Sequence, residues 1–311
     1  MKKTPAFIVA FISILRGADQ NVPRPKILGI AHAAFYVSDL EKTRVFYRDF
    51  LGYAEPFALK NADETGDRIA FIKINDYQYI ELFNEKPRAV QQLNHISFYT
   101  EDAHKMREYL AAKGVKVPDK VGKGKTGNFN YNITDPDGHI VEMVEYQPDS
   151  WTGQRHGKLM PDTRISDHIA HVGVVVGPLA ASLRFYHGIL GFNEFWRGGG
   201  SPTMLSWVNM RVPDGTDYLE MMLYDKLPDA DKRGTRNHVC LVVPDVEKAV
   251  ATLKSRPAYE IYGQDITVKV GVNHKRQANL FDPDGTRIEL MEADTFDGKP
   301  VPPSTAPVAL P

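Results

Sequence analysis

Four short stretches of the chain are hydrophobic, continuously or in alternation, for the length of a β-strand, and each carries a histidine near its beginning. A turn or the start of a helix follows each stretch. After the first, Ser38 and Glu41 have the spacing of a capping box. The pattern therefore predicts four strands that begin alike. Their histidines are His32, His95, His171 and His238.

A glutamate follows each histidine after roughly 50 residues, inside another apolar stretch that also predicts a strand. Between the two strands the pattern predicts a helix, which in the first unit spans about 39 to 50 and stops before Gly52, and then further strands. The chain therefore reads as four βαβββ units, each opened by a histidine strand and closed by a glutamate strand. The glutamates are Glu81, Glu142, Glu220 and Glu289.

The length of 311 residues is typical of two domains, which fits two pairs of units. We expect a first domain over 27–147, a linker over 148–164 that holds prolines and glycines without periodicity, and a second domain over 165–294. The proline-rich tail, 295–311, has no hydrophobic pattern. It is expected to be disordered or to lie on the surface.

The N-terminal residues 1–26 form a candidate signal peptide and a lead-in to the first strand. Two lysines precede an apolar run from Ala6 to Leu15, which has the length of a signal's hydrophobic region and is too short to span a bilayer. Arg16 stands where a cleavage site prefers a small residue. A functional signal would export the protein to the periplasm or the medium. Without one, the protein would stay in the cytoplasm.

Composition and charge exclude two classes of partner. The chain is 42% hydrophobic and 25% charged with a net charge of −1, and it has no basic cluster, so we expect no nucleic-acid binding. No other apolar stretch is long enough for a membrane span.

The single cysteine, Cys240, falls inside a predicted strand and is expected to be a buried hydrophobe rather than a catalytic thiol. The loop at 122–125 lacks phosphate-loop spacing and is expected to be solvated.

The repeated histidines and glutamates are candidate metal ligands. Side chains alternate along a strand, so His32 shares a face with Ala34, and Glu81 shares one with Phe83. A carboxylate in an apolar wall is costly unless it is paired or bound to a cation. One such pair alone is explained by a satisfied histidine and a solvated glutamate, whereas four pairs in step favour a shared cation. Imidazole and carboxylate together suit a divalent transition metal such as Mn, Fe, Co, Ni or Zn.

The units resemble those of the vicinal oxygen chelate superfamily, which includes glyoxalase I, extradiol ring-cleavage dioxygenases, fosfomycin-resistance proteins and bleomycin-binding proteins. The resemblance covers 27–293. It implies an α+β fold in which four βαβββ modules pair into two open, strongly curved mixed β-sheets around a metal, with first-strand histidines and last-strand glutamates as ligands. The matching features are the histidine strands, the helix start at 38–40 with Phe46-Tyr47 and Leu51-Gly52-Tyr53, and the Asp-Pro-Asp-Gly turns before Glu142 and Glu289.

The resemblance leaves the pairing of the units open. If neighbouring units pair, one metal set is His32, Glu81, His95 and Glu142, and the other is His171, Glu220, His238 and Glu289. The family also contains single-chain members in which the first unit pairs with the fourth. His32 and Glu81 would then join His238 and Glu289, and the remaining four would form the second set. Whether the protein is a monomer or a homodimer also stays open.

The resemblance implies a divalent-metal-dependent enzyme of the glyoxalase-like type, a lyase or isomerase that moves a proton on a small substrate with vicinal oxygens. Glu142 or Glu289 would be the catalytic proton shuttle. Tyr36 stands where glyoxalase I has an arginine for glutathione, so a different substrate is expected. The C-terminal half is favoured as the active one, because apolar side chains there could form a pocket. These are Trp196, Trp207, Met221 and Met222.

Two other functions stay open on the same fold. An Fe(II) extradiol-type ring-cleavage dioxygenase would use two histidines and one carboxylate, His171, His238 and Glu289. His274 would be its pocket histidine, but Asn279 stands where those enzymes have a tyrosine, and a fourth ligand would be superfluous. A metal-free small-molecule binding or resistance protein would need no ligands, so the complete histidine and glutamate sets count against it.

Overall fold

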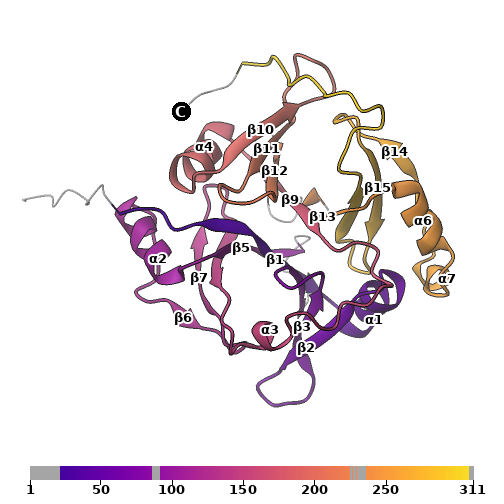
Figure 1. Cartoon of the computed structure of the whole chain (residues 1–311), viewed down its shortest axis with the longest axis horizontal. Helices are drawn as coiled ribbons and strands as arrows, with labels where there is room; N and C mark the ends of the chain where they lie inside the picture. Colours follow the sequence, from indigo (N-terminus) through magenta and orange to yellow (C-terminus); the bar gives the residue numbers. More distant parts are fainter. Residues whose placement is uncertain (1–21, 86–91, 225, 227–228, 230–235, 308–311) are drawn as a thin grey trace, which may run out of the picture.

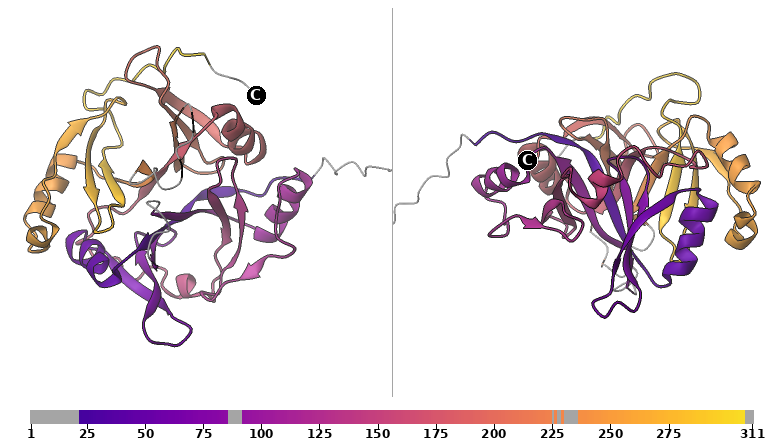
Figure 2. Two further views of the ribbon diagram at one scale, coloured as in Figure 1. Left: turned by 180° about the vertical axis from the view of Figure 1, so that it is seen from behind. Right: turned by 60° about the horizontal axis from the view of Figure 1, so that its bottom comes forward.

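The computed structural model describes residues 22–85, 92–224, 226, 229 and 236–307. Its strands form two open, strongly curved eight-stranded sheets that lie side by side, with helices on their outer faces (Figure 1 and Figure 2). The apolar run of the candidate signal peptide falls in 1–21, outside the described residues. Among the helices that the structure describes, none is both long enough and apolar enough to cross a membrane.

The first sheet contains the strands of the first two units in the order β2-β3-β4-β1-β5-β8-β7-β6. Strand β1 is parallel to β4 and antiparallel to β5, and β5 is parallel to β8. The bounds are β1 Ile27–Val37, α1 Leu40–Arg44, the π-helical turn η1 Val45–Phe50, β2 Ala54–Lys60, β3 Asp67–Lys73, β4 Tyr79–Asn84, β5 Leu93–Thr100, α2 Ala103–Ala112, β6 Gly122–Lys123, β7 Phe129–Thr134, β8 Ile140–Glu145 and α3 Trp151–Gln154.

The second sheet repeats this plan in the order β10-β11-β12-β9-β13-β16-β15-β14. Strand β9 is parallel to β12 and antiparallel to β13, and β13 is parallel to β16. The bounds are β9 Ile169–Val176, α4 Leu179–Leu183, the π-helical turn η2 Arg184–Ile189, β10 Asn193–Gly198, β11 Trp207–Arg211, β12 Tyr218–Leu223, β13 His238–Val242, α6 Val246–Lys254, α7 Ala258–Tyr262, β14 Val268–Val270, β15 Arg276–Phe281 and β16 Arg287–Met291.

The strand orders decide how the units pair. Units one and two share the first sheet, and units three and four share the second. The arrangement in which the first unit joins the fourth is not found. The predicted α+β class, with paired βαβββ modules in two open, curved mixed sheets, is confirmed.

The first helix has a different cap from the one that the capping-box spacing predicts. Asp39, not Ser38, is the N-cap, because its backbone is extended and its side chain accepts a hydrogen bond from the Lys42 amide at 3.1 Å. The helix continues as the π-helical turn η1, and Gly52, with φ of +82°, follows its end. The predicted span of about 39 to 50 therefore agrees with α1 and η1 together.

The segments outside the two predicted domains pack against the sheets where they are described. In the linker, the carbonyls of Arg155 and Lys158 accept hydrogen bonds from the buried Nζ of Lys73. In the C-terminal tail, the Ser304 amide donates to the carbonyl of Arg197 on β10 at 3.0 Å. Of the two expectations for the tail, lying on the surface describes it as far as residue 307.

Each sheet is tied to the other through the turn that precedes a glutamate strand. The Tyr186 hydroxyl of η2 donates to Asp135 Oδ2, before β8, at 2.9 Å. The Tyr47 hydroxyl of η1 makes the equivalent contact with Asp282 Oδ2, before β16, at 3.4 Å. The Asp-Pro-Asp-Gly turns therefore serve both as tight turns and as contacts between the halves.

The two turn aspartates differ in the charge state that the fold favours. Burial works to raise the pKa of Asp135, but a hydrogen bond from His139 Nδ1 at 2.9 Å and the charge of His139 outweigh it, and the pKa is lowered. Asp282 has Thr286 at the position of His139, and burial raises the pKa of Asp282 to about 7. The fold therefore favours the protonated form of Asp282.

Asp282→Asn should stabilise the protein above neutral pH. A raised folded-state pKa means that Asp282 contributes stability below its unfolded value of 3.8, and that this contribution is lost as pH rises through about 7. Asparagine cannot ionise and keeps the acceptor for the Asp284 and Thr286 amides. The free energy of unfolding in urea should rise by about 1–3 kcal/mol at pH 8, and by less at pH 5.

Asp135→Asn is the matched control, because the pKa of Asp135 is lowered in the folded protein. Its contribution to stability is present above the unfolded pKa and is lost as pH falls. This variant should therefore be less stable than wild type at pH 8. An Asp282→Asn protein that loses stability at pH 8, as the control does, would contradict the assignment.

Candidate metal centre

The first set of candidate ligands comes from four adjacent strands at the middle of the first sheet, β4, β1, β5 and β8. In the strand register, Ala34 on β1 pairs with both Glu81 and His95. His32 lies two residues from Ala34 and so shares its face. Ser97, two residues from His95, pairs with Glu142 on β8. The register therefore directs all four side chains to one face of the sheet. They are His32, Glu81, His95 and Glu142.

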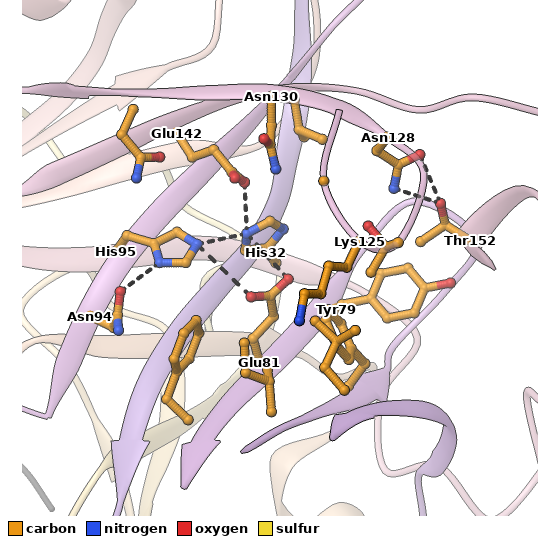
Figure 3. Close-up of a pocket in the computed structure, with 18 of the residues that line it drawn as sticks. His32, Tyr79, Glu81, Asn94, His95, Lys125, Asn128, Asn130, Glu142 and Thr152 are labelled. Carbon is orange, nitrogen blue, oxygen red and sulfur yellow. Dashed lines mark hydrogen bonds and ion pairs between the residues drawn. The ribbon is translucent and has the colours of Figure 1, made fainter. Parts of the chain in front are cut away.

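These four side chains converge on one point (Figure 3). His32 Nε2 lies 2.9 Å from His95 Nε2, 3.0 Å from Glu142 Oε2 and 3.5 Å from Glu81 Oε1. Glu81 Oε2 lies 4.0 Å from His95 Nε2. His32, His95 and Glu142 are at most 7% exposed. Ligand atoms of His32, His95 and Glu142 all lie within 4.8 Å of one another, close enough to hold one ion, and Glu81 lies beside them.

A neighbouring amide orients one of the imidazoles. The side-chain oxygen of Asn94 lies 2.8 Å from His95 Nδ1, so this nitrogen carries the proton and donates it. The lone pair of His95 Nε2 then faces the centre of the set, which is the arrangement of a metal-binding histidine. Two imidazole nitrogens and two carboxylates that meet in this way fit a divalent transition metal.

The buried carboxylates of the first set need a positive charge nearby to compensate their own charge. Burial works to lower the pKa of His32, but the charges of Glu81 and Glu142 outweigh it and raise the pKa. Burial lowers the pKa of His95 to about 4 and raises that of Glu81 to about 7. Burial also works to raise the pKa of Glu142, but the charge of His32 and hydrogen bonds from His32 and Ser97 lower it. A divalent cation would supply the charge that His32 otherwise provides.

The second set repeats the arrangement on β12, β9, β13 and β16. His171 Nε2 lies 3.2 Å from His238 Nε2 and 3.3 Å from Glu289 Oε2. Glu220 Oε2 lies 3.5 Å from His238 Nε2 and 4.0 Å from His171 Nε2. The structure therefore brings all eight predicted residues into two groups of four, one in each sheet.

The surroundings of the second set differ from those of the first. Arg287 Nη2 makes a close contact with His238 Nδ1, and burial followed by the charge of Arg287 lowers the pKa of His238 to about 4. The first half has Ile140 at the position of Arg287. The His238 ring lies against Gly173, where a Cβ atom would be 1.9 Å from its Cε1, whereas the first half has Ala34 there. The same four candidate ligand types therefore have different neighbours in the two halves.

Cys240 lies beside the second set. Its thiol, a nitrogen of His171 and an oxygen of Glu289 all lie within 4.8 Å of one another. The cysteine is fully buried, as expected, and burial together with the charges of Glu289 and Glu220 raises the pKa of the thiol. Because the thiolate is the reactive form, this thiol is not an activated nucleophile.

The family model of the Glyoxalase/Bleomycin resistance protein/Dioxygenase superfamily matches residues 29–143 and 168–290. The chain belongs to this superfamily. The two matched ranges contain the two sets of four candidate ligands. Membership shows the family and leaves the reaction to be decided by the site.

Known proteins of two reaction types are similar to this superfamily member. Glyoxalase I of Saccharomyces cerevisiae is 24% identical over 230 residues, which cover 67% of this chain and 65% of that protein. The chain thus spans just under two thirds of the length of that relative. The structure of the Mn(II)-bound glyoxalase from Novosphingobium aromaticivorans aligns with a TM-score of 0.65 and 16% identity, covering 92% of this chain and 88% of that one.

The 2,3-dioxygenase LapB from Pseudomonas sp. KL28 aligns with a TM-score of 0.64 and 16% identity, covering 90% of this chain and 98% of LapB. A variant of homoprotocatechuate 2,3-dioxygenase from B. fuscum aligns with a TM-score of 0.65 and 19% identity, covering 90% of this chain and 75% of that one. At this identity the likeness is one of fold. The shared fold therefore includes both glyoxalases and dioxygenases.

The first set opens into a cavity of about 370 Å³. Phe71 and Tyr79 form part of its apolar wall, and the amides of Asn130 and Asn132 lie on β7, the strand next to β8. Tyr36 packs against Phe83 and is not among the lining residues. The cavity combines candidate metal ligands, apolar surface and hydrogen-bonding groups, which is typical of a small-molecule site.

The four apolar residues that favoured the C-terminal half lie in different places. Trp207 and Met222 pair with each other and share the sheet face that carries Glu220. Met221 belongs to the hydrophobic core, because it alternates with Glu220 along β12 and so faces away from it. Trp196 and His274 line a cavity of about 670 Å³ between β10, the β14–β15 turn and the C-terminal tail. None of the four candidate ligands of the second set lines this cavity.

Sequence reasoning missed two cations of the first cavity, Arg68 and Lys125. Lys125 belongs to the loop that was expected to be solvated; it is exposed, yet its side chain reaches into the cavity (Figure 3). The alternation of Asn128, Asn130 and Asn132 before Glu142 was a usable signal, because three amides at two-residue spacing mark a polar strand face. No comparable pattern marks Arg68.

Asn94→Ala should weaken metal binding by the first set. The variant loses the acceptor that fixes the His95 tautomer, and loss of such a partner typically lowers metal affinity by about 10–100-fold. Isothermal calorimetry, in which metal-stripped protein is titrated with Mn²⁺ or Zn²⁺, measures the change in metal affinity.

Asn237→Ala is the matched control, since Asn237 precedes His238 as Asn94 precedes His95. Its side-chain oxygen accepts a hydrogen bond from the Val175 amide at 2.9 Å and does not hold a histidine. Metal affinity of the first set should be unchanged in this variant. Equal affinity in wild type and Asn94→Ala would show that Asn94 does not orient a metal ligand.

Proposed function

We propose that the protein is a divalent-metal-dependent enzyme that moves a proton on a small substrate with two adjacent oxygens. The observation that carries this proposal is the complete two-histidine, two-glutamate set on the wall of the first cavity. We place the reaction in the N-terminal half because that set lines a cavity of about 370 Å³ together with apolar and amide groups. Family membership supports the metal-dependent class.

His32, Glu81, His95 and Glu142 would hold the metal. A bound divalent cation polarises oxygens on the substrate and so makes an adjacent carbon–hydrogen bond more acidic. Asn94 keeps His95 Nε2 free of a proton for this role. The rings of Phe71 and Tyr79 lie on the face of the sheet that carries Glu81 and limit the access of water there, which strengthens the electrostatic interactions of the site.

Glu142 is the proposed proton shuttle. Its Oε2 accepts a hydrogen bond from Ser97 Oγ at 2.8 Å and lies 3.0 Å from His32 Nε2. These contacts hold one carboxylate oxygen and leave Oε1 for the substrate. A base fixed through one oxygen can take a proton from a bound carbon and return it without changing its position.

Glu142→Gln should lower turnover by about 10²–10⁴-fold, because glutamine keeps the shape and the Ser97 contact but cannot accept the proton. A series of 2-hydroxy carbonyl compounds serves as trial substrates. NMR monitors the exchange of their carbon-bound hydrogen with deuterium from D₂O. Glu145→Gln is the control on the same strand, since Glu145 accepts from the Ala103 amide and does not line the cavity.

Two results would overturn the proposal. One is wild-type protein that binds no divalent metal, which would instead favour a metal-free binding protein. The other is exchange that depends on Glu289→Gln and not on Glu142→Gln, which would move the reaction to the second set.

A ring-cleaving dioxygenase is the second candidate. Two histidines and one carboxylate of the second set, His171, His238 and Glu289, lie within 3.6 Å of one another, as a site for non-haem iron requires. Glu220, at 3.5 Å from His238, adds a carboxylate that such a site does not use. Incubation of the Fe(II)-loaded protein with catechols under O₂, with absorbance of a ring-cleavage product as readout, separates the two candidates.

A further inference from the structure

We propose that the substrate of the first cavity carries an anionic oxygen group, a carboxylate or a phosphate, which Arg68 and Lys125 bind. This inference rests on the proposed function, since it names the substrate class of the same site. Both cations line the cavity that holds the first set of ligands. Neither side chain has a hydrogen bond or an ion pair with any other described residue.

A β-bulge turns Arg68 toward the cavity. Leu59 pairs with Ile69, but the next residue of β2, Lys60, pairs with Asp67, so Arg68 is left without a partner. A bulge breaks the alternation of side chains and re-aims the extra residue. Arg68 therefore lines the cavity beside Ile69, while Asp67 forms ion pairs with Lys60 and Arg44.

The loop that carries Lys125 is held in place. The Gly124 amide donates to the Asn128 carbonyl at 2.8 Å, and the Trp151 amide of the linker donates to the Thr126 carbonyl at 2.8 Å. Gly127, with φ of +92°, packs so closely that a Cβ atom there would lie 3.0 Å from Ser150 Cα. Lys125 thus reaches the cavity from a fixed backbone (Figure 3), which reduces the entropic cost of binding an anion.

Neighbouring cations are paired, which sets Arg68 and Lys125 apart. Lys123, on the same loop, lies 3.3 Å from Asp149, and Lys60 lies 2.6 Å from Asp67. A metal at the first set would balance the charge of its glutamates, so those carboxylates do not supply the missing partner. An anionic substrate group would supply it, and arginine and lysine both bind such groups through charge-assisted hydrogen bonds.

The cavity also offers neutral donors for an oxygen-rich substrate. The Tyr79 hydroxyl is buried without a partner among the described residues. A phenol hydroxyl can donate a hydrogen bond, so this group is available to a substrate oxygen. The amides of Asn130 and Asn132 lie on the lining face of β7.

The second half of the chain provides an internal comparison. Phe71 pairs with Glu81, and Asn209 makes the equivalent pair with Glu220. Arg68 lies three residues before Phe71, so the equivalent position in the second half is Ser206. Likewise Asn132 pairs with Glu142 as Asn279 pairs with Glu289, so Val272 occupies the position of Lys125. The fold does not need a cation at either position. Arg68 and Lys125 are therefore features of the first cavity alone.

The test compares three probes that share a 2-hydroxy carboxylate and differ in the group on carbon 3: lactate, malate and 3-phosphoglycerate. Calorimetry on the Mn²⁺-loaded full chain gives each dissociation constant, with metal content measured before and after titration. Malate or 3-phosphoglycerate, which each carry a second anionic group, should bind at least about tenfold more tightly than lactate. Whichever of malate and 3-phosphoglycerate binds more tightly identifies the anion as carboxylate or phosphate.

In the double variant Arg68→Gln, Lys125→Gln, the ratio of the dissociation constant of lactate to that of the preferred probe should fall toward one. Lactate binding and metal content should stay unchanged. Lys123→Gln is the control on the same loop and should keep the preference. No preference in wild type, or a preference that survives in the double variant, would overturn the inference. Failure of the proposed function is seen separately, because the D₂O exchange assay does not depend on which probe binds more tightly.

Discussion

The structure depends on the cost of burying ionisable groups. Each sheet places two carboxylates and two imidazoles where little water reaches them, and a buried charge is unfavourable without compensation. The groups compensate one another in part, since His32 lies close to Glu81 and Glu142. A divalent cation would compensate them more fully. Four strands that hold these groups within a few ångströms therefore make sense as a preformed ion site.

The two halves repeat the same four candidate ligand types but place different residues around them. An amide orients His95 in the first half, whereas Arg287 contacts the equivalent imidazole of His238 in the second. The first set lines a cavity with two unpaired cations, and their counterparts in the second half are a serine and a valine. Two sites with the same four ligand types thus differ in local charge, and charge near a metal or a substrate decides which chemistry a site supports.

The same turns that position the glutamate strands also join the two halves. Asp135 accepts hydrogen bonds within its own turn and from Tyr186 of the other half. Strand β8, which carries Glu142, begins just after this turn. A change at the contact between the halves therefore acts on a strand that holds a candidate ligand, so stability and site geometry are linked through a few buried groups.

The sequence by itself determined the repeated unit and the fold class, and it singled out the eight candidate ligands that the structure gathers into two groups. These follow from local regularities: period-two strands, a glycine after the first helix of three of the units, and a histidine and a glutamate at nearly constant separation. It also placed the first helix well, although Asp39 rather than Ser38 caps it. The capping residue depends on backbone conformation, and both residue types fit the position.

Only the tertiary structure decided which units pair and which groups surround each set of candidate ligands. Pairing depends on contacts between strands far apart in the chain, and either arrangement uses the same sequence pattern. Met221 was a candidate for the pocket but faces the core, because strand alternation sends it away from Glu220. Arg68 enters the cavity through a bulge, which depends on the register between β2 and β3 and leaves no regular pattern in the sequence.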